Sequence, residues 1–105
     1  MFNYDRTHKV GNVPPRRRIL GELVDDPGQY MIRFLDASLN EIAAPVPTTV
    51  DQTRRGRVDA PITACPSAGG GVQIVDAVAE WQFGPAWTTG GASENDGPEL
   101  IKVDC

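Results

Sequence analysis

The sequence predicts an all-β fold, a small antiparallel β-sandwich or barrel that carries an extended N-terminal arm. Two observations lead to this prediction. Short apolar segments, rich in alternating and β-branched residues, follow one another along the 105 residues, and clusters of Gly, Pro, Asp and Asn separate them. Near the N-terminus, two consecutive prolines disfavour both a helix and a regular ladder of hydrogen bonds.

The predicted arm comprises residues 1–15, and residues 16–105 form a single β domain. Pro14 and Pro15 favour polyproline geometry at the junction. Phe2 and Tyr4 give the arm two large aromatic side chains, which bury considerable area where they dock. We therefore expect an ordered arm to lie against its own domain or against a neighbouring subunit.

The first three predicted strands are separated by turn residues. Residues 16–24 form one strand, which ends at the sequence DDPGQ. Residues 29–35 form the clearest strand, because their aromatic and branched residues alternate along it. A turn at 36–40, closed by Asp and Asn side chains, leads into a third strand at 41–50, so these two strands form a hairpin. Two prolines in the third strand place it at an edge of the sheet or bend it away.

The second half of the chain is less regular. Residues 51–71 are predicted to be mostly loop, with a short strand near 61–65. Residues 72–83 fit a strand or a helix, and we favour a strand because three glycines precede them and the rest of the chain is β-like. An apolar patch around Trp87 and a polar loop follow, and residues 99–105 form the last strand.

The net charge of −4 is unevenly distributed. Residues 1–57 carry nine Lys or Arg against seven Asp or Glu, whereas residues 58–105 carry one against seven. This asymmetry could align neighbouring copies head to tail or meet a partner of opposite charge, and it is also compatible with an ordinary solvated surface. The acidic total and the absence of a nucleic-acid recognition motif argue against a nucleic-acid partner.

We expect no membrane association and no export signal. The sequence has no apolar run long enough to cross a bilayer, and residues 1–18 lack the apolar core of a signal peptide. We therefore expect cytoplasmic synthesis, with the chain either free or built into an assembled particle.

No motif predicts catalysis, a cofactor or a metal. The glycines at 69–71 lack the Lys-Ser/Thr pair of a phosphate-binding loop. Cys65 could act as a nucleophile only with a nearby base, and the single histidine, His8, lies in the predicted arm. One His and two distant Cys do not make a tetrahedral metal site, and the acidic segment 93–99 lacks the spacing of a calcium loop.

Cys65 and Cys105 leave three alternatives open. They could remain free thiols, form a disulfide within the chain, or link two subunits through Cys105. An internal bond would close a loop of about 41 residues and contribute about 4 kcal/mol through chain entropy.

These observations favour a non-enzymatic structural or accessory subunit of a larger homo- or hetero-oligomeric protein assembly, for example a capsid-decorating or tail/neck component of a virion. Trp81, Phe83 and Trp87 form the one aromatic concentration of the sequence, and they are interpreted as core residues or, alternatively, as an interface anchor. The predicted interface residues are Phe2, Tyr4, Arg16, Arg17, Arg18, Arg54, Arg55, Arg57 and Trp87. The alternatives are a small soluble module that binds or inhibits one protein partner and, third, a Cys-dependent enzyme or redox protein.

Overall fold

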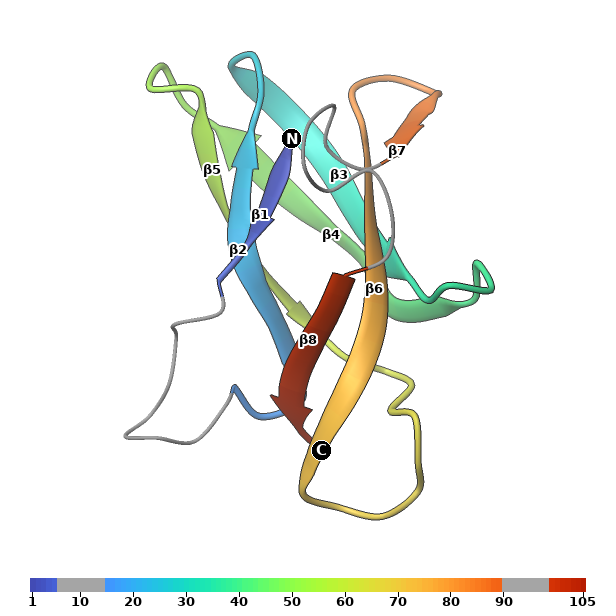
Figure 1. Ribbon diagram of the computed structural model, residues 1–105. Helices are drawn as coiled ribbons and strands as arrows, with labels where there is room; N and C mark the ends of the chain where they lie inside the picture. The colour runs from blue at the N-terminus through green and yellow to red at the C-terminus, as the bar shows by residue number, and fades with distance from the viewer. Residues whose placement is uncertain (6–14, 90–98) are drawn as a thin grey trace.

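The computed structural model describes residues 1–5, 15–89 and 99–105, and these residues form eight β-strands without a helix (Figure 1). The predicted all-β class is therefore confirmed. The strands are β1 (Phe2–Tyr4), β2 (Arg18–Val24), β3 (Gly28–Leu35), β4 (Glu41–Val50), β5 (Arg55–Pro61), β6 (Val72–Gln82), β7 (Trp87–Thr89) and β8 (Glu99–Asp104).

Two antiparallel sheets pack against each other in a sandwich-like arrangement. The smaller sheet has the order β1-β2-β5, and the larger has the order β4-β3-β6-β7, with β8 paired to the first half of β6. The turn between β4 and β5 carries the chain from one sheet to the other. At a second junction the main-chain N–H of Arg17 donates to the carbonyl of Asp104 at 2.7 Å, so the start of β2 adjoins the end of β8.

The first residues of the chain belong to the smaller sheet. β1 pairs with β2, and Phe2 is 1% exposed, with its ring 5.2 Å from that of Phe34 across the core. Gly21 makes this possible, since a Cβ there would lie 2.4 Å from the Phe2 ring and from the carbonyl oxygen of Asn3. Residues 6–14 of the predicted arm lie outside the described part of the chain.

The predicted hairpin of β3 and β4 is confirmed. The Asp36 carboxylate accepts the main-chain N–H groups of Ser38 and Asn40, both at 2.9 Å, and these bonds lower the pKa of Asp36. β4 is the outermost strand of its sheet, as its two prolines predicted.

The segment at 51–71 differs from its prediction. Residues 55–61 form β5, in which exposed and buried residues alternate without a break, so the prediction of a loop there and of a strand near 61–65 is wrong. Gly56, Asp59 and Pro61 are weak strand formers and hid the pattern. Their pairing with β2 forms the strand despite this local weakness.

β6 resolves the ambiguity between strand and helix in favour of the strand. Val75, Ala77, Ala79 and Trp81 point inward and are buried, as the two-residue period requires. The Trp81 indole N–H donates to the Asp25 carboxylate at 2.9 Å, so its polar group is satisfied at the end of the core.

Candidate interaction surfaces

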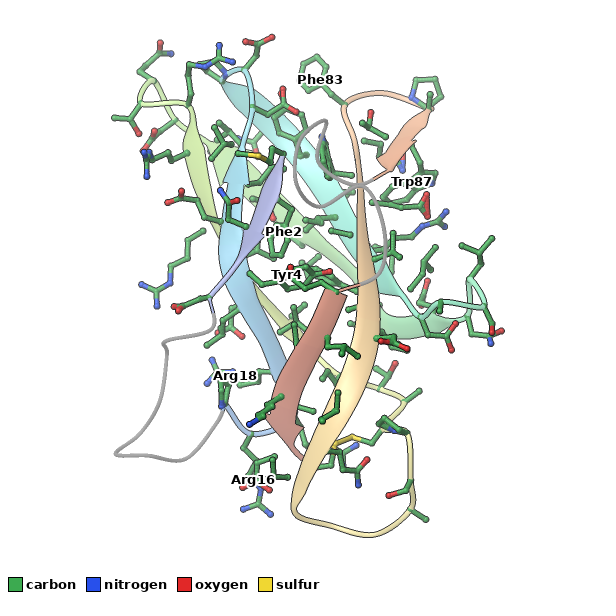
Figure 2. All side chains as sticks on the ribbon, viewed as in Figure 1. Phe2, Tyr4, Arg16, Arg18, Phe83 and Trp87 are labelled. Atoms are coloured by element: carbon green, nitrogen blue, oxygen red, sulfur yellow. A yellow bond between two sulfur atoms is a disulfide. The ribbon has the colours of Figure 1, made fainter. Side chains whose placement is uncertain are left out.

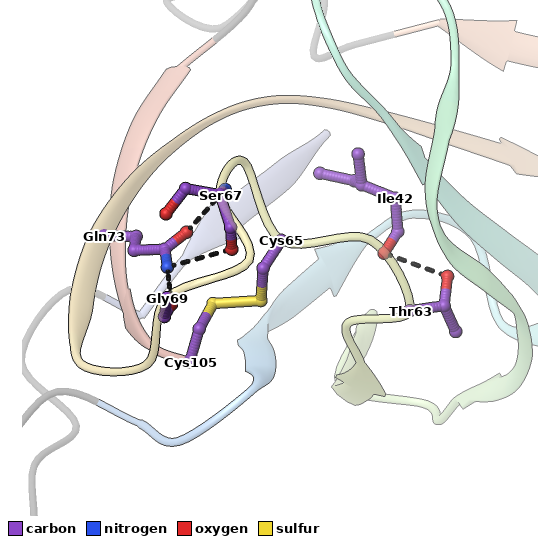
Figure 3. Close-up of a disulfide and its surroundings, with 7 residues drawn as sticks. All are labelled: Ile42, Thr63, Cys65, Ser67, Gly69, Gln73 and Cys105. Carbon is purple, nitrogen blue, oxygen red and sulfur yellow. Dashed lines mark hydrogen bonds between the residues drawn. A yellow bond between two sulfur atoms is a disulfide. The ribbon is translucent and has the colours of Figure 1, made fainter.

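The two cysteines are joined in a disulfide. Cys65, in the loop between β5 and β6, bonds to Cys105, and their Cα atoms lie 6.5 Å apart (Figure 3). Both residues pack against the core cluster. While this bond is intact, neither sulfur is available as a thiolate nucleophile. In addition, the described residues contain no group of three His, Cys, Asp or Glu placed to hold a metal ion.

The glycine-rich loop before β6 is closed by Gln73. Its side-chain oxygen accepts the N–H of Ser67 at 3.1 Å, and its amide nitrogen donates to the carbonyls of Ser67 and Gly69 (Figure 3). Gly71 adopts φ +98°, a conformation that favours glycine, and its carbonyl accepts the N–H of Cys105 at 2.7 Å. These bonds identify the loop as a fixed connection between strands.

Three of the six predicted interface arginines form ion pairs within the chain. Arg18 pairs with Asp59, Arg54 with Asp26, and Arg55 with Glu22. All three pairs are solvent-exposed, and pairs of this kind contribute little to stability.

The other three predicted interface arginines are Arg16, Arg17 and Arg57. Their side chains have no partner among the residues that the structure describes. All of them are exposed. Figure 2 shows Arg16 and Arg18 at the end of the molecule remote from Phe83 and Trp87.

The aromatic residues of the predicted arm are occupied inside the molecule. Phe2 lies in the core, and the Tyr4 hydroxyl donates to the Ala77 carbonyl on the opposite sheet at 2.8 Å (Figure 2). Burial raises the pKa of Tyr4 well above its ordinary value. Both side chains therefore hold the two sheets together.

An apolar tip, defined here as Phe83 and Trp87, flanks the turn between β6 and β7 (Figure 2). Phe83 is 68% exposed and packs on Tyr30, with ring centroids 5.2 Å apart. The Arg33 guanidinium carbon lies 4.1 Å from the Trp87 ring centroid, and Arg33 also pairs with Glu80 at 3.1 Å. The half-buried Trp87 is thus held in place while the Phe83 ring faces solvent.

A second exposed surface, the apolar patch, consists of Val72 and Ile74 on β6 and Leu100 on β8. These side chains are 59%, 56% and 66% exposed. Ile74 on β6 pairs with Lys102 on β8. Leu100 lies two residues before Lys102 on β8, so its side chain is on the same face of the sheet and is the diagonal neighbour of Ile74.

Sequence reasoning missed the patch and the exposure of Phe83. The alternation in β6 assigned Phe83 to the inner face, but the strand ends at Gln82, before that alternation reaches the aromatic ring. A signal for the patch exists in the sequence VQIV, where apolar residues stand on both faces of the strand.

A groove of about 430 Å³ lies beside the patch. It runs between the β3–β4 turn, the loop at 64–66 and the free side of β6, and its lining includes Asp36, Glu41, Ile42, Cys65, Ile74, Val75 and Asp76.

Comparison of the chain with protein-family models, with curated proteins and with solved structures finds no match. Within the described residues no helix could span a membrane. The two apolar surfaces and the groove are therefore the candidate functional features of the molecule.

Proposed function

We propose that this protein is a non-enzymatic structural or accessory subunit of a larger protein assembly. The observation behind the proposal is the placement of the tip and the patch at the two ends of β6. Val72 and Phe83 are eleven positions apart in the sequence, which corresponds to roughly 35 Å along a strand. The longest dimension of the molecule is 38 Å. The two apolar surfaces thus lie nearly as far apart as the molecule allows.

Two separated apolar surfaces suit a subunit with two neighbours. Solvent-exposed large apolar side chains that cluster mark interaction sites, whereas isolated ones are ordinary. A module that binds one partner needs one such surface. If the tip of one copy contacts the patch of the next, the contact is heterologous and repeats along a row or around a ring.

A virion component is the kind of assembly that we favour. Capsid-decorating and tail or neck subunits are commonly compact β modules, and the size and sandwich-like fold of this chain suit that role. The assignment to a virion is an analogy of fold and size, whereas the two exposed apolar surfaces support the role of an assembly subunit in general.

A small soluble binding or inhibitory module is the second candidate. The tip favours it, because a partly buried tryptophan fixed by an arginine beside an exposed phenylalanine is typical of a binding hot spot.

The test is the solution mass, measured by light scattering over a range of protein concentrations. Phe83→Ser removes the tip, Ile74→Ser removes the centre of the patch, and Leu39→Ser is the matched control, since Leu39 is 70% exposed and belongs to neither surface. We expect the wild type and the control to associate with rising concentration. Each surface variant should weaken association at least tenfold, because a heterologous contact needs both surfaces.

A monomer at every concentration, for all four proteins, would contradict assembly between copies of this chain. In that case the tip would be the binding surface for a different protein, as the second candidate function requires.

A further inference from the structure

In the part of the chain that the structure describes, one edge of the first half of β6 has no strand paired with it, and this is called the open edge. Residues 72–77 pair with β8 on one side, while β3 pairs with residues 78–82 only, and its ladder ends where Leu35 meets Val78. Beyond that point the β3–β4 turn diverges, and Figure 1 shows this turn and β8 on opposite sides of β6. The groove occupies the space that a further strand would fill, because the turn at 36–41 and residues 74–76 both line it.

The main chain along this edge has hydrogen-bonding groups to offer. The carbonyl oxygen of Gly71 accepts the N–H of Cys105, so the main-chain N–H and C=O groups of Gly71 point toward β8. Along a strand, the main-chain N–H and C=O groups of successive residues point to opposite edges. Those of Val72, Ile74 and Asp76 therefore point away from β8 and toward the groove. Within residues 1–5, 15–89 and 99–105, no main-chain hydrogen bond is formed by these three residues on that side.

The walls of the groove are fixed. Val75 and Ile42 are buried and form its floor. The Ile42 carbonyl accepts both the N–H of Thr63 at 2.8 Å and its hydroxyl at 3.3 Å, which holds the loop at 64–66 against β4 (Figure 3). The disulfide at Cys65 ties the same loop to the C-terminal residue. A preformed groove of this volume accepts a few residues of extended chain.

The charge of the lining is of one sign. Among the described residues that line it, Asp36, Glu41 and Asp76 are the charged ones, and none is Lys or Arg. The Asp36 carboxylate is engaged by its own turn. Glu41 and Asp76 are exposed and have no side-chain partner in the described part of the chain. A bound segment therefore meets a net negative field that favours Lys or Arg.

We propose that this groove binds one extended, cationic segment of another protein, which adds as a strand to the open edge of β6. Main-chain hydrogen bonds to Val72, Ile74 and Asp76 supply the pairing, and alternate side chains of the segment enter the groove or meet its carboxylates. Pairing with the same edge of a second copy is disfavoured, because that edge carries the same negative charges. Binding of this segment does not require the tip, although Ile74 belongs both to the groove lining and to the patch proposed for assembly.

The probe is a fluorescein-labelled heptapeptide of alternating Lys and Val, titrated with the intact, oxidised protein and followed by fluorescence anisotropy. We expect saturable binding that weakens as salt is raised, since exposed charges are screened. Two control peptides test the two parts of the proposal. Alternating Glu and Val reverses the charge, and a central proline removes a main-chain donor. Each should bind at least tenfold more weakly.

The protein variants locate the site. Asp76→Lys combined with Glu41→Lys should weaken binding of the Lys–Val peptide at least tenfold. Asp26→Lys combined with Asp59→Lys is the matched control, because it reverses two exposed carboxylates outside the groove, and it should leave binding within twofold. If the double reversal does not fold, Asp76→Asn with Glu41→Gln removes the charges with minimal change in shape and should still weaken binding.

Amide hydrogen exchange then identifies the paired edge. The N–H groups of Val72, Ile74 and Asp76 should exchange more slowly when the Lys–Val peptide is bound. The proposal is overturned if the peptide protects another strand, if the control reversal weakens binding as much as the groove reversal, or if the acidic peptide binds equally well. It is also overturned if, in the Phe83→Ser variant without added peptide, these amides become protected with rising protein concentration, because the occupant would then be a second copy.

Discussion

Two buried hydroxyl groups, those of Tyr4 and Thr48, have opposite effects on the stability of the fold. The Tyr4 hydroxyl bridges the two sheets through its bond to Ala77. The Thr48 hydroxyl is buried, and the described residues provide it with no hydrogen-bond partner. A satisfied buried hydroxyl stabilises a fold, whereas an unsatisfied one destabilises it by its lost hydration.

Removing these hydroxyls should therefore have different results. Tyr4→Phe keeps the ring and loses the bond, so the free energy of unfolding should fall by about 1 kcal/mol. Thr48→Val keeps the shape and removes an unpaired group, so it serves as the control and should be neutral or stabilising. Urea unfolding at pH 7 measures both. Equal losses in the two variants would contradict the assigned role of Tyr4.

The Tyr4 hydroxyl also makes stability depend on alkaline pH. Burial raises the pKa of Tyr4 above the 10.0 of an exposed tyrosine, so the folded state retains the proton more strongly than the unfolded state. This contribution is complete below pH 10 and is lost as the pH rises toward the folded-state pKa. Wild type should consequently lose stability faster than Tyr4→Phe above about pH 10.

At the scale of elements, the sequence predicted those strands whose pattern is local. β3, β6 and β8 show alternation along their own residues, and the β3–β4 turn contains the Asp and Asn that close it. β5 was missed because its weak strand formers depend on pairing with β2. The strand at Phe2–Tyr4 was included in an arm, because the glycine that accommodates it lies seventeen residues beyond Tyr4 in the sequence.

Gly21 should control whether β1 docks. A methyl group at this position meets a main-chain oxygen, which cannot rotate away as a side chain can. Gly21→Ala should displace β1, expose the Phe2 ring and cost about 1–3 kcal/mol. Gly70→Ala is the control, because the space around Gly70 is open. Denaturant unfolding and proteolysis near the N-terminus measure the effect, and identical behaviour of the two variants would refute it.

At the scale of the whole molecule, the disulfide closes a large loop of the unfolded chain. The two cysteines are 40 residues apart in sequence, so the bond should contribute about 4 kcal/mol by limiting the unfolded ensemble. Cys65→Ser with Cys105→Ser should lower the free energy of unfolding by about this amount. The reduced wild type should match the double variant in urea unfolding. No difference between oxidised and reduced protein would contradict the prediction.

The candidate sites were less predictable than the fold. Trp87 could be identified from its apolar surroundings, and the cysteine pair was among the alternatives left open by the sequence. The patch and the groove arise from residues brought together by pairing, as Ile74 and Leu100 are, or by divergence of the β3–β4 turn from β6. Such proximity depends on the pairing register between strands, which the local pattern of one strand does not reveal. The ion pairs of Arg18, Arg54 and Arg55 could not be predicted either, because each joins residues that are distant in the sequence and meet only when the strands pair.

The placement of the two tryptophans gives the molecule a built-in pair of optical reporters. Trp81 is 4% exposed, so its emission should be blue-shifted and shielded from a soluble quencher until the core opens. Trp87 lies half-buried beneath a guanidinium at the tip, where quencher access should change as soon as that end is covered. One unlabelled sample can thus distinguish loss of the core from occupation of the tip, through two spectral components of the same chain.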